Sequence, residues 1–187
     1  MTSIVALVVG GTPESWESLG FAKLSTEGTR TLFSLTDVQL VVDSSRQPGS
    51  VDWHLADEPF TGPQGRIGCL CVDHVVWRTN DLDATCDEVT RLTGAPRKRV
   101  RDAGNGMVQG FHRVDNVVVE VVAGGETVVE PHLWGFVVNV ADLDAVCAFA
   151  GPDVIGAPKP ATQEGRRIAT ARSGAGLGVP FALMDVQ

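Results

Sequence analysis

The sequence has little cysteine, little positive charge and no long apolar run. Its four cysteines form neither a C-x-x-C motif nor a disulfide framework, so we expect reduced thiols and a cytoplasmic location. The first apolar run, residues 4–9, is too short for the core of a signal peptide and lacks a preceding basic segment. A transmembrane helix needs about 20 apolar residues. No stretch meets this requirement, so the sequence predicts no membrane partner.

Basic residues are outnumbered, with 15 lysines and arginines against 23 acidic residues and a net charge of −8. A nucleic-acid-binding protein needs a basic face to neutralise phosphates, so we expect no nucleic-acid partner. The one basic run, residues 97–101, follows a predicted helix end. It is open to two interpretations, a solvated loop or a contact with an anion, and the solvated loop is favoured.

A hexapeptide pattern, D-L-D-A-x-C, occurs twice. The copies begin at Asp81 and Asp142, which are 61 residues apart (142 − 81), and each follows an apolar run. Apolar residues continue at helical spacing until a glycine, which predicts a helix in both places. Cys86 and Cys147 lie on the apolar faces, where a free cysteine acts as a small hydrophobe. Self-similarity at a fixed distance indicates a duplicated structural unit.

Both copies lie in the same predicted order of elements, namely strand, helix and three strands. The N-terminal segment has this order in shorter form, with Thr12 and Pro13 as a helix start and Gly20 as its stop. The sequence therefore predicts an α+β protein of repeated βαβββ modules. We divide it into a shortened N-terminal module (1–45), a linker with one short strand (46–66), and two further modules (67–124 and 125–187).

Three segments of the middle module carry a family resemblance: D-H-V-V from Asp73, D-L-D-A from Asp81, and V-V-V-E ending at Glu120. The corresponding segments of the last module are G-F-V-V from Gly135, D-L-D-A from Asp142, and G-V-P-F ending at Phe181. This arrangement resembles the vicinal oxygen chelate superfamily, which includes glyoxalase I, extradiol dioxygenases, fosfomycin-resistance enzymes and bleomycin-binding proteins. The resemblance covers residues 67–187 well and residues 1–45 more weakly.

The resemblance implies that two modules pair into a half-open barrel around a cavity, with metal ligands on the first and last strand of each module. His74 and Glu120 occupy those positions in the middle module, and both suit a divalent metal such as Zn, Mn, Fe or Ni. In the last module the positions fall on Gly135 and Ala182, which offer no ligand. The ligand set is thus incomplete within one chain. Either no metal binds, or a homodimer supplies further ligands.

Two other histidines do not complete the set easily. His132 lies an odd number of residues before Gly135, so on a continuous strand it points to the other face. His112 lies on a neighbouring strand and contributes only if its side chain points inward.

His74 and Glu120 have a structural and a functional interpretation. Glu120 interrupts the apolar run at residues 117–122, and burying a carboxylate is costly without a partner. Strand alternation places Val118, Glu120 and Val122 on the face toward His74. The pair either orders the sheet through a hydrogen bond, or forms half a metal site or an acid/base dyad. We expect both side chains to face the cavity within reach of each other or of a ligand.

The resemblance implies two leading functions, both with a small-molecule partner. The first is a glyoxalase-like lyase or dioxygenase that polarises substrate oxygens with a metal and uses His74 and Glu120 in catalysis. The second is a metal-free protein of the bleomycin-resistance type that binds or sequesters a small organic molecule. A catalytically silent member that acts by association is a third.

Three remaining features have mainly structural interpretations. Arg166 and Arg167 precede a predicted strand, and a solvated turn is favoured there over contact with a substrate anion. The tryptophans at positions 53, 77 and 134 are interpreted as packing residues. The glycine-rich segment 174–178 lies between two predicted strands and opens no helix, which argues against a dinucleotide-binding loop.

Overall fold

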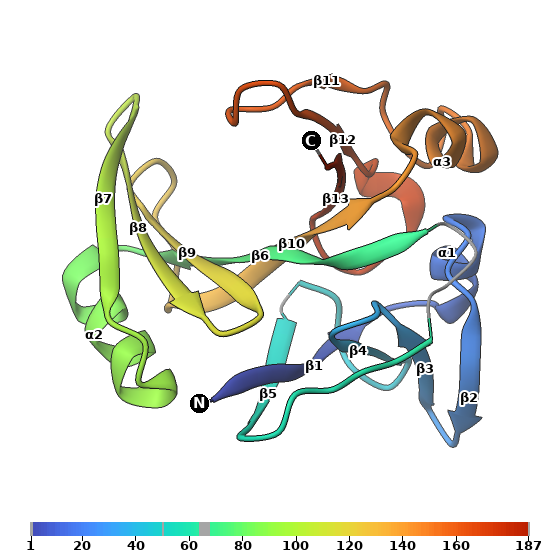
Figure 1. The fold of residues 1–187 in the computed structure, drawn as a ribbon, viewed down its shortest axis with the longest axis horizontal. Coiled ribbons are helices and arrows are strands. Elements are labelled where there is room, and N and C mark those ends of the chain that lie inside the picture. Colours follow the sequence, from blue (N-terminus) through green and yellow to red (C-terminus); the bar gives the residue numbers. More distant parts are fainter. Residues whose placement is uncertain (1, 50, 64–67, 187) are drawn as a thin grey trace.

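The chain folds into three successive βαβββ units (Figure 1). The structure is a computed structural model that describes residues 2–49, 51–63 and 68–186. The first unit contains β1 (Ser3–Gly10), α1 (Pro13–Ser18), β2 (Lys23–Glu27), β3 (Arg30–Ser34) and β4 (Gln39–Asp43). The second contains β6 (Cys69–Thr79), α2 (Leu82–Thr93), β7 (Arg97–Gly104), β8 (Met107–Val114) and β9 (Val117–Ala123). The third contains β10 (His132–Val140), α3 (Leu143–Ala150), β11 (Lys159–Pro160), β12 (Arg167–Thr170) and β13 (Phe181–Asp185).

The two D-L-D-A segments are helix starts, as predicted. Asp81 is the N-cap of α2, where its Oδ1 accepts a hydrogen bond from the Ala84 amide at 3.0 Å. Asp142 caps α3 in the same way, through the Ala145 amide at 2.9 Å. An N-cap carboxylate satisfies a helix amide that would otherwise lack a partner. The repeated sequence therefore fixes the same strand-to-helix junction twice.

All three units pair their first strand in parallel with their last strand: β1 with β4, β6 with β9, and β10 with β13. The registers also agree between units, since Val76 pairs with Glu120 and Val137 pairs with Ala182. These pairs support the sequence alignment that set Gly135 opposite His74 and Ala182 opposite Glu120. The predicted α+β fold of βαβββ modules is confirmed.

The second and third units join through antiparallel pairing of β6 with β10. Their strands follow the order β7-β8-β9-β6-β10-β13-β12-β11, which curves into a half-open barrel (Figure 1). In this view the concave side opens upward, between β7–β9 on one side and β11–β13 on the other. Helices α2 and α3 lie on the outside of the sheet. The barrel therefore has an uncovered inner face on which side chains from both units meet.

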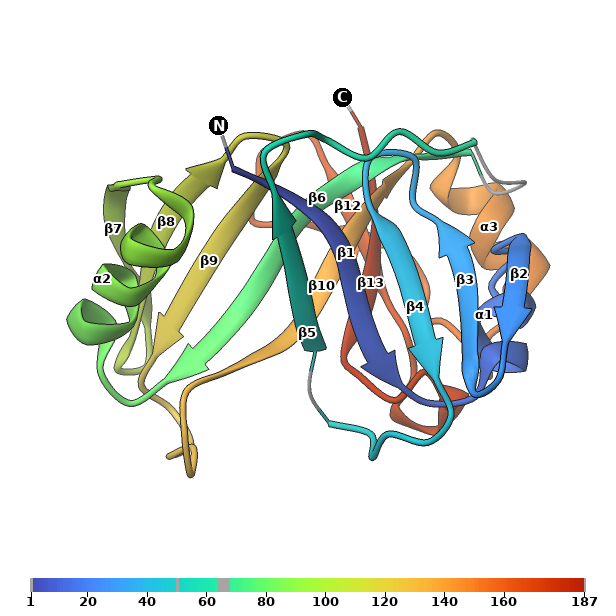
Figure 2. The ribbon, with the colours of Figure 1, turned by 90° about the horizontal axis from the view of Figure 1, so that it is seen from below.

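The first unit covers the convex side of the barrel: it lies below β6 and β10 in Figure 1 and in front of them in Figure 2. Trp16 of α1 is fully buried there, stacked on Phe136 at 5.8 Å and edge-on to Phe181 at 5.0 Å. The strand within the predicted linker, β5 (Val51–Ala56), pairs with β1 and touches β10 through one residue pair. Trp53 on β5 packs edge-on against Trp77 at 5.2 Å, which confirms their packing role. The module boundaries themselves remain a prediction, and residues 64–67 of the linker lie outside the described residues.

No helix among the described residues is long and apolar enough to cross a membrane. The longest, α2, has 12 residues, which is too few for the roughly 20 that a span requires.

Asp37 joins the first unit to the second. It lies between β3 and β4, and its Oδ1 accepts a hydrogen bond from the Val72 amide of β6 at 3.0 Å. Burial raises the pKa of Asp37 to about 6, although this hydrogen bond and the positive charge of Arg113 act in the opposite direction. The junction thus contains a carboxyl group that is protonated more readily in the folded chain than in the unfolded chain.

We expect Asp37 to make the fold less stable as the pH rises from about 4 to about 6. The folded-state pKa lies above the unfolded value of 3.8, so the folded chain binds more protons in this window and loses stability as the pH increases. Asp37→Asn keeps an oxygen for the Val72 amide and should remove this slope. At neutral pH it should raise the free energy of unfolding by up to about 2 kcal/mol, after a discount for partial solvent contact.

The measurement is urea unfolding of wild type and Asp37→Asn at a series of pH values, with the exposed Asp57→Asn as a matched control. The control should follow wild type. An Asp37→Asn curve parallel to wild type from pH 4 to 7 would show that burial does not perturb this carboxyl group.

Candidate functional site

A two-part cavity lies on the concave face between the second and third units. One part has a volume of about 560 Å³ and the other about 310 Å³. Both are lined by His74, Glu120, Ile168 and Thr170, so they meet at these four residues. A larger outer groove of about 700 Å³ lies between α1, β2 and α3, and its lining Asp142 already caps a helix. The other charged side chains of this groove, Glu17 and Lys23, lie 3.7 Å apart and pair with each other. We take the inner cavity as the candidate site because polar side chains from both units meet in it.

His74 and Glu120 face each other where the two parts of the cavity meet. The His74 Nε2 atom lies 3.7 Å from a carboxylate oxygen of Glu120, and both side chains are 15% exposed. Val118 and Val122 line the cavity on either side of Glu120, as strand alternation predicts. The predicted placement of the pair is confirmed. Its catalytic or metal-binding role stays a prediction.

A β-bulge turns Asp73 toward the same cavity. In the pairing of β6 with β10, His74 lies opposite Val137 and Val72 opposite Val138, which leaves Asp73 as an extra residue. Such a bulge breaks the normal alternation of side chains. The Asp73 carboxylate consequently lines the cavity beside His74 and contacts the imidazole Nδ1 at 2.7 Å.

Arg166 and Asn139 hold the other side of Asp73. The Arg166 guanidinium donates to Asp73 at 2.9 Å, and the Asn139 amide donates to it at 3.0 Å. Burial raises the pKa of Asp73, but hydrogen bonds from His74 and Arg166 outweigh it and hold the pKa well below its usual range. Asp73 is therefore ionised at neutral pH. Since an ionised carboxylate only accepts hydrogen bonds, the Nδ1 atom of His74 carries a proton.

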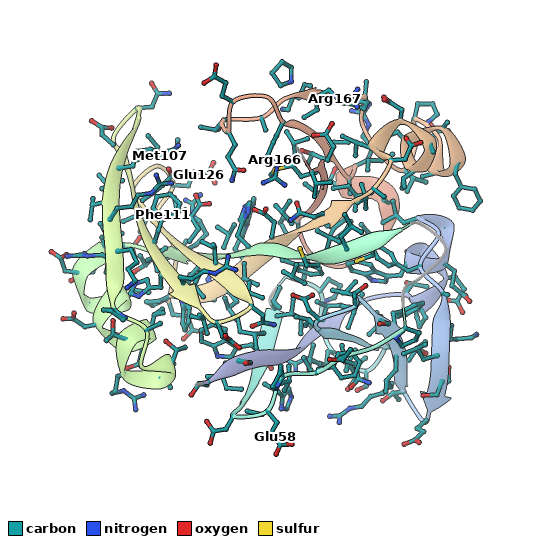
Figure 3. The ribbon with its side chains drawn as sticks, in the orientation of Figure 1. Glu58, Met107, Phe111, Glu126, Arg166 and Arg167 are labelled. Atoms are coloured by element: carbon teal, nitrogen blue, oxygen red, sulfur yellow. The ribbon has the colours of Figure 1, made fainter. Side chains whose placement is uncertain are left out.

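Arg166 is part of this cluster, contrary to the favoured solvated turn. Its side chain is 12% exposed and also donates to Asn139, Gln163 and the Asp185 carbonyl. Arg167 begins β12 and forms ion pairs with Asp144 and Asp185 on the outer surface. In Figure 3, Arg166 and Phe111 lie on opposite sides of the opening of the barrel.

Glu120 is held by a second chain of contacts. Its Oε1 accepts a hydrogen bond from the Gln109 amide, and the Gln109 oxygen accepts one from Arg101 Nε at 2.8 Å. Arg101 in turn lies over the Phe111 ring, with its guanidinium carbon 5.8 Å from the ring centroid. The carboxylate of Glu120 is thus fixed from β8 and β7 while its other oxygen faces His74.

The basic run at residues 97–101 forms part of β7, so its interpretation as a solvated loop is wrong. Pairing with β8 makes the side chains alternate, and Arg99 and Arg101 line the cavity. Lys98 is exposed and does not belong to the lining. The competing interpretation, contact with an anion, is compatible with this placement.

The two parts of the cavity differ in character. The larger part contains the cationic side chains of Arg99, Arg101 and Lys159. The smaller part is mostly apolar, and its side chains come from both units: Val76, Val122, Trp134, Val137, Ile168 and Ala182. Trp134 is 41% exposed at this end, so it is not the packing residue that the sequence suggested. The cavity therefore has a cationic end and an apolar end, with His74 and Glu120 between them.

The other histidines do not reach this site. His112 is 1% exposed, and its Nδ1 lies 2.9 Å from the Ala95 carbonyl, beneath the end of α2. Burial lowers the pKa of His112, which favours the neutral imidazole. His132 contacts the Glu130 carbonyl through its Nδ1 at 2.9 Å, and His54 is exposed on β5.

The ligand positions of the third unit do not fit a metal. A side chain at Gly135 is blocked, because its Cβ would lie 2.3 Å from the Pro180 carbonyl oxygen. Ala182 is 6% exposed and packs with Val137 and Met184 in a small apolar cluster. Among the described residues, no three His, Cys, Asp or Glu side chains are arranged to hold a metal ion. Two ligands are fewer than the three protein ligands that catalytic zinc and non-haem iron sites generally use.

The sequence matches no family model and no curated protein. The fold is similar to methylmalonyl-CoA epimerase from Mycobacterium tuberculosis, at 18% identity and a TM-score of 0.54, over 65% of this chain and 91% of that chain. It is also similar to a variant of methylmalonyl-CoA epimerase from Streptomyces coelicolor in complex with 2-nitronate-propionyl-CoA, at 18% identity and a TM-score of 0.51, over 63% and 94% of the two chains. A hypothetical protein from Bacillus halodurans gives 11% identity and a TM-score of 0.52, over 62% and 94%.

Methylmalonyl-CoA epimerase is a member of the vicinal oxygen chelate superfamily, and this chain has the fold of that superfamily. At sequence identities this low, the similarity concerns the fold alone. Residues 67–187 account for 121 of the 187 residues, about the share of this chain that the similar structures cover.

Sequence reasoning missed most of the polar groups around the two predicted site residues. For Asp73, in the D-H-V-V segment, strict alternation predicts a side chain that points away from the cavity, on the opposite face from His74. Gln109, Asn139 and Lys159 gave no signal, since isolated polar residues on strands usually face solvent. The one available hint for Arg99 and Arg101 was their spacing, since two residues that are two apart share a face if the segment is a strand.

Proposed function

We propose that this protein binds a small organic molecule in the cavity between its second and third units. The observation that carries the proposal is the ionisable pair of His74 and Glu120, held on two adjacent strands where a polar and an apolar cavity meet. Burying such groups is costly unless they serve each other or a ligand. At 3.7 Å, the imidazole and the carboxylate are too far apart for a good mutual hydrogen bond, so both can still bond to a ligand atom that lies beside the pair in the cavity.

The surrounding contacts suit His74 for proton transfer to or from a bound molecule. Asp73 fixes the proton on Nδ1, so Nε2 is the ring nitrogen that faces Glu120 and the cavity and that can exchange a proton with a ligand. Glu120 lies on the same side and offers a second group that accepts or returns a proton. Such a dyad contributes general acid–base catalysis when a ligand proton lies within hydrogen-bond reach. The same cavity is compatible with an enzyme of this kind and with a protein that only binds the molecule.

The test of the proposal is a thermal-shift screen of small organic molecules, with hits confirmed by calorimetry on wild type and on Trp134→Ala. A ligand of the inner cavity should bind more weakly to the variant, because the ligand loses the indole contact. Hits that bind both proteins equally, or no hit from a chemically broad screen, would contradict the proposal.

A metal-dependent lyase or dioxygenase is the second candidate that the family resemblance raised. A Zn, Mn, Fe or Ni ion would find His74 and Glu120, but Gly135 and Ala182 supply nothing and Pro180 blocks the first of these positions. We therefore favour metal-free binding within one chain. A homodimer that adds ligands from a second chain remains the route by which a metal site would form.

We expect the monomeric protein to retain far less than one metal ion per chain. After incubation with Zn, Mn, Fe or Ni and passage through a desalting column, elemental analysis should find little metal, because two protein ligands hold an ion weakly. One tightly held ion per monomer, lost in His74→Ala, would show that the ligand analysis is wrong. An ion held only by a dimer would support assembly of the site from two chains.

The four cysteines are free, with Cys69 buried and its pKa raised to about 12 by burial and by nearby Asp37 and Cys71. Free thiols fit a reducing compartment, so we propose a cytoplasmic location.

A further inference from the structure

We infer that the cavity selects an amphipathic organic anion, with its acidic group held by Arg99, Arg101 and Lys159 and its apolar body in the opposite end. This inference rests on the proposed function and specifies the chemical class and the orientation of the ligand. It is carried by the placement of positive charge inside a protein whose net charge is −8.

Three cationic side chains gather at one end of the cavity from two separate units. Arg99 and Arg101 come from β7 of the second unit, and Lys159 comes from β11 of the third unit. The ion pairs found among the described residues use other arginines and lysines: Lys23, Arg30, Arg46, Arg91, Arg97, Arg166 and Arg167. The three cations at this end of the cavity thus keep their charge available to a ligand.

Contacts with the Phe111 ring hold the side chains of Arg99 and Arg101 in place. The guanidinium of Arg99 lies 4.5 Å from the centroid of the Phe111 ring, and Arg101 reaches the same ring at 5.8 Å. Contact with an aromatic face orients a guanidinium and reduces the freedom that it loses on binding. Planar guanidinium groups match a carboxylate or a phosphate through paired hydrogen bonds. An acidic group of the ligand therefore fits this end of the cavity.

The carboxylates near this end do not cancel the positive charge. Asp73 is neutralised by Arg166, which contacts it at 2.9 Å. Glu120 lies where the two parts of the cavity meet and accepts its hydrogen bond from Gln109, which separates it from Arg101. A ligand anion beside Arg99 and Lys159 meets attraction there, whereas the lining of the opposite end is mostly apolar. The cation at that end, Arg78, donates to the backbone carbonyls of Gly124 at 3.3 Å and Glu126 at 3.2 Å.

The test uses two probes of the same shape, the anion 2-naphthoate and the neutral 2-naphthamide, titrated into the protein by calorimetry at neutral pH. Wild type should bind naphthoate more tightly than naphthamide by about fivefold or more, and added salt should reduce the difference by screening. Both probes should quench Trp134 fluorescence, since their rings occupy the apolar end.

The variant that tests the cationic end is Arg99→Gln combined with Lys159→Gln. Arg101 is kept because it holds Gln109 against Glu120. Both replaced residues are exposed, so the fold should persist, which the melting temperature checks. Naphthoate affinity should fall by about tenfold, while naphthamide affinity should stay within about twofold. The matched control, Lys98→Gln with Lys23→Gln, removes the same charge outside the cavity and should leave both affinities unchanged.

The failure of this inference can be told from failure of the proposed function. Equal binding of the two probes, or equal loss in the test and control variants, would overturn the anion subsite while a small-molecule cavity stands. Failure of naphthoate to bind a protein that binds neutral molecules in the cavity would do the same. If no molecule binds the cavity, both the inference and the proposed function are wrong.

Discussion

Asp73→Ala is expected to lower the free energy of unfolding by about 3–5 kcal/mol, the usual cost of removing one partner from a buried ion pair. Asp73 and Arg166 are 13% and 12% exposed, so the guanidinium that remains cannot turn to solvent without leaving Asn139 and the Asp185 carbonyl. The same substitution removes the acceptor of the His74 Nδ1 proton. The variant should therefore lose both stability and the fixed orientation of the imidazole.

Urea unfolding measures this effect, with Asp52→Ala as the control. Asp52 pairs with Arg46 but is 55% exposed, and removing a surface pair should cost less than about 1 kcal/mol. The loss of unfolding free energy in Asp73→Asn should lie between those of Asp73→Ala and Asp52→Ala, because the amide oxygen still accepts a hydrogen bond while the charge is lost. A loss in Asp73→Ala no larger than in Asp52→Ala would mean that Arg166 does not depend on this carboxylate.

Glu120→Gln is expected to weaken ligand binding at least tenfold, equivalent to about 1.4 kcal/mol, while the fold survives. The amide keeps the shape of the side chain and can still contact Gln109, but it brings no charge to the cavity beside His74. If the pair only orders the sheet, the substitution should change ligand affinity little and lower the free energy of unfolding by about 1–3 kcal/mol.

Calorimetry with a ligand from the screen distinguishes the two outcomes when it is combined with urea unfolding. Glu58→Gln is the matched control, because Glu58 is exposed and lies on the side of the molecule away from the concave face (Figure 3). His74→Gln should parallel Glu120→Gln in its effect on ligand affinity. Unchanged affinity in both variants would leave the pair with a structural role alone.

The fold was predictable from sequence because its signals are local and repeated. The aspartate caps at Asp81 and Asp142, the apolar runs before them and the glycines after the helices each act within a few residues. Glu120 was predictable for a related reason, since a single carboxylate in an apolar strand is costly and must have a partner. Strand alternation then placed it on the face toward His74, and the family resemblance placed both residues at the cavity.

The remaining site depends on features that no local pattern reveals. The bulge at Asp73 changes which face the side chain occupies, and it arises from the register between β6 and β10. Arg166 reaches Asp73 from 93 residues away. The block at Gly135 comes from Pro180, which lies on the adjoining segment of the third unit. Residues 97–101 looked like a solvated run because charge dominated their composition, whereas pairing with β8 gives each side chain a defined face.

The most direct test is a crystal structure of the protein with a molecule that the thermal-shift screen identifies. We predict that the ligand lies between the second and third units, with one of its polar atoms within hydrogen-bond distance of His74 Nε2 or the Glu120 carboxylate. A ligand in the outer groove beside α3, or a His74 or Glu120 side chain turned to bulk solvent, would contradict the assignment of this cavity as the functional site.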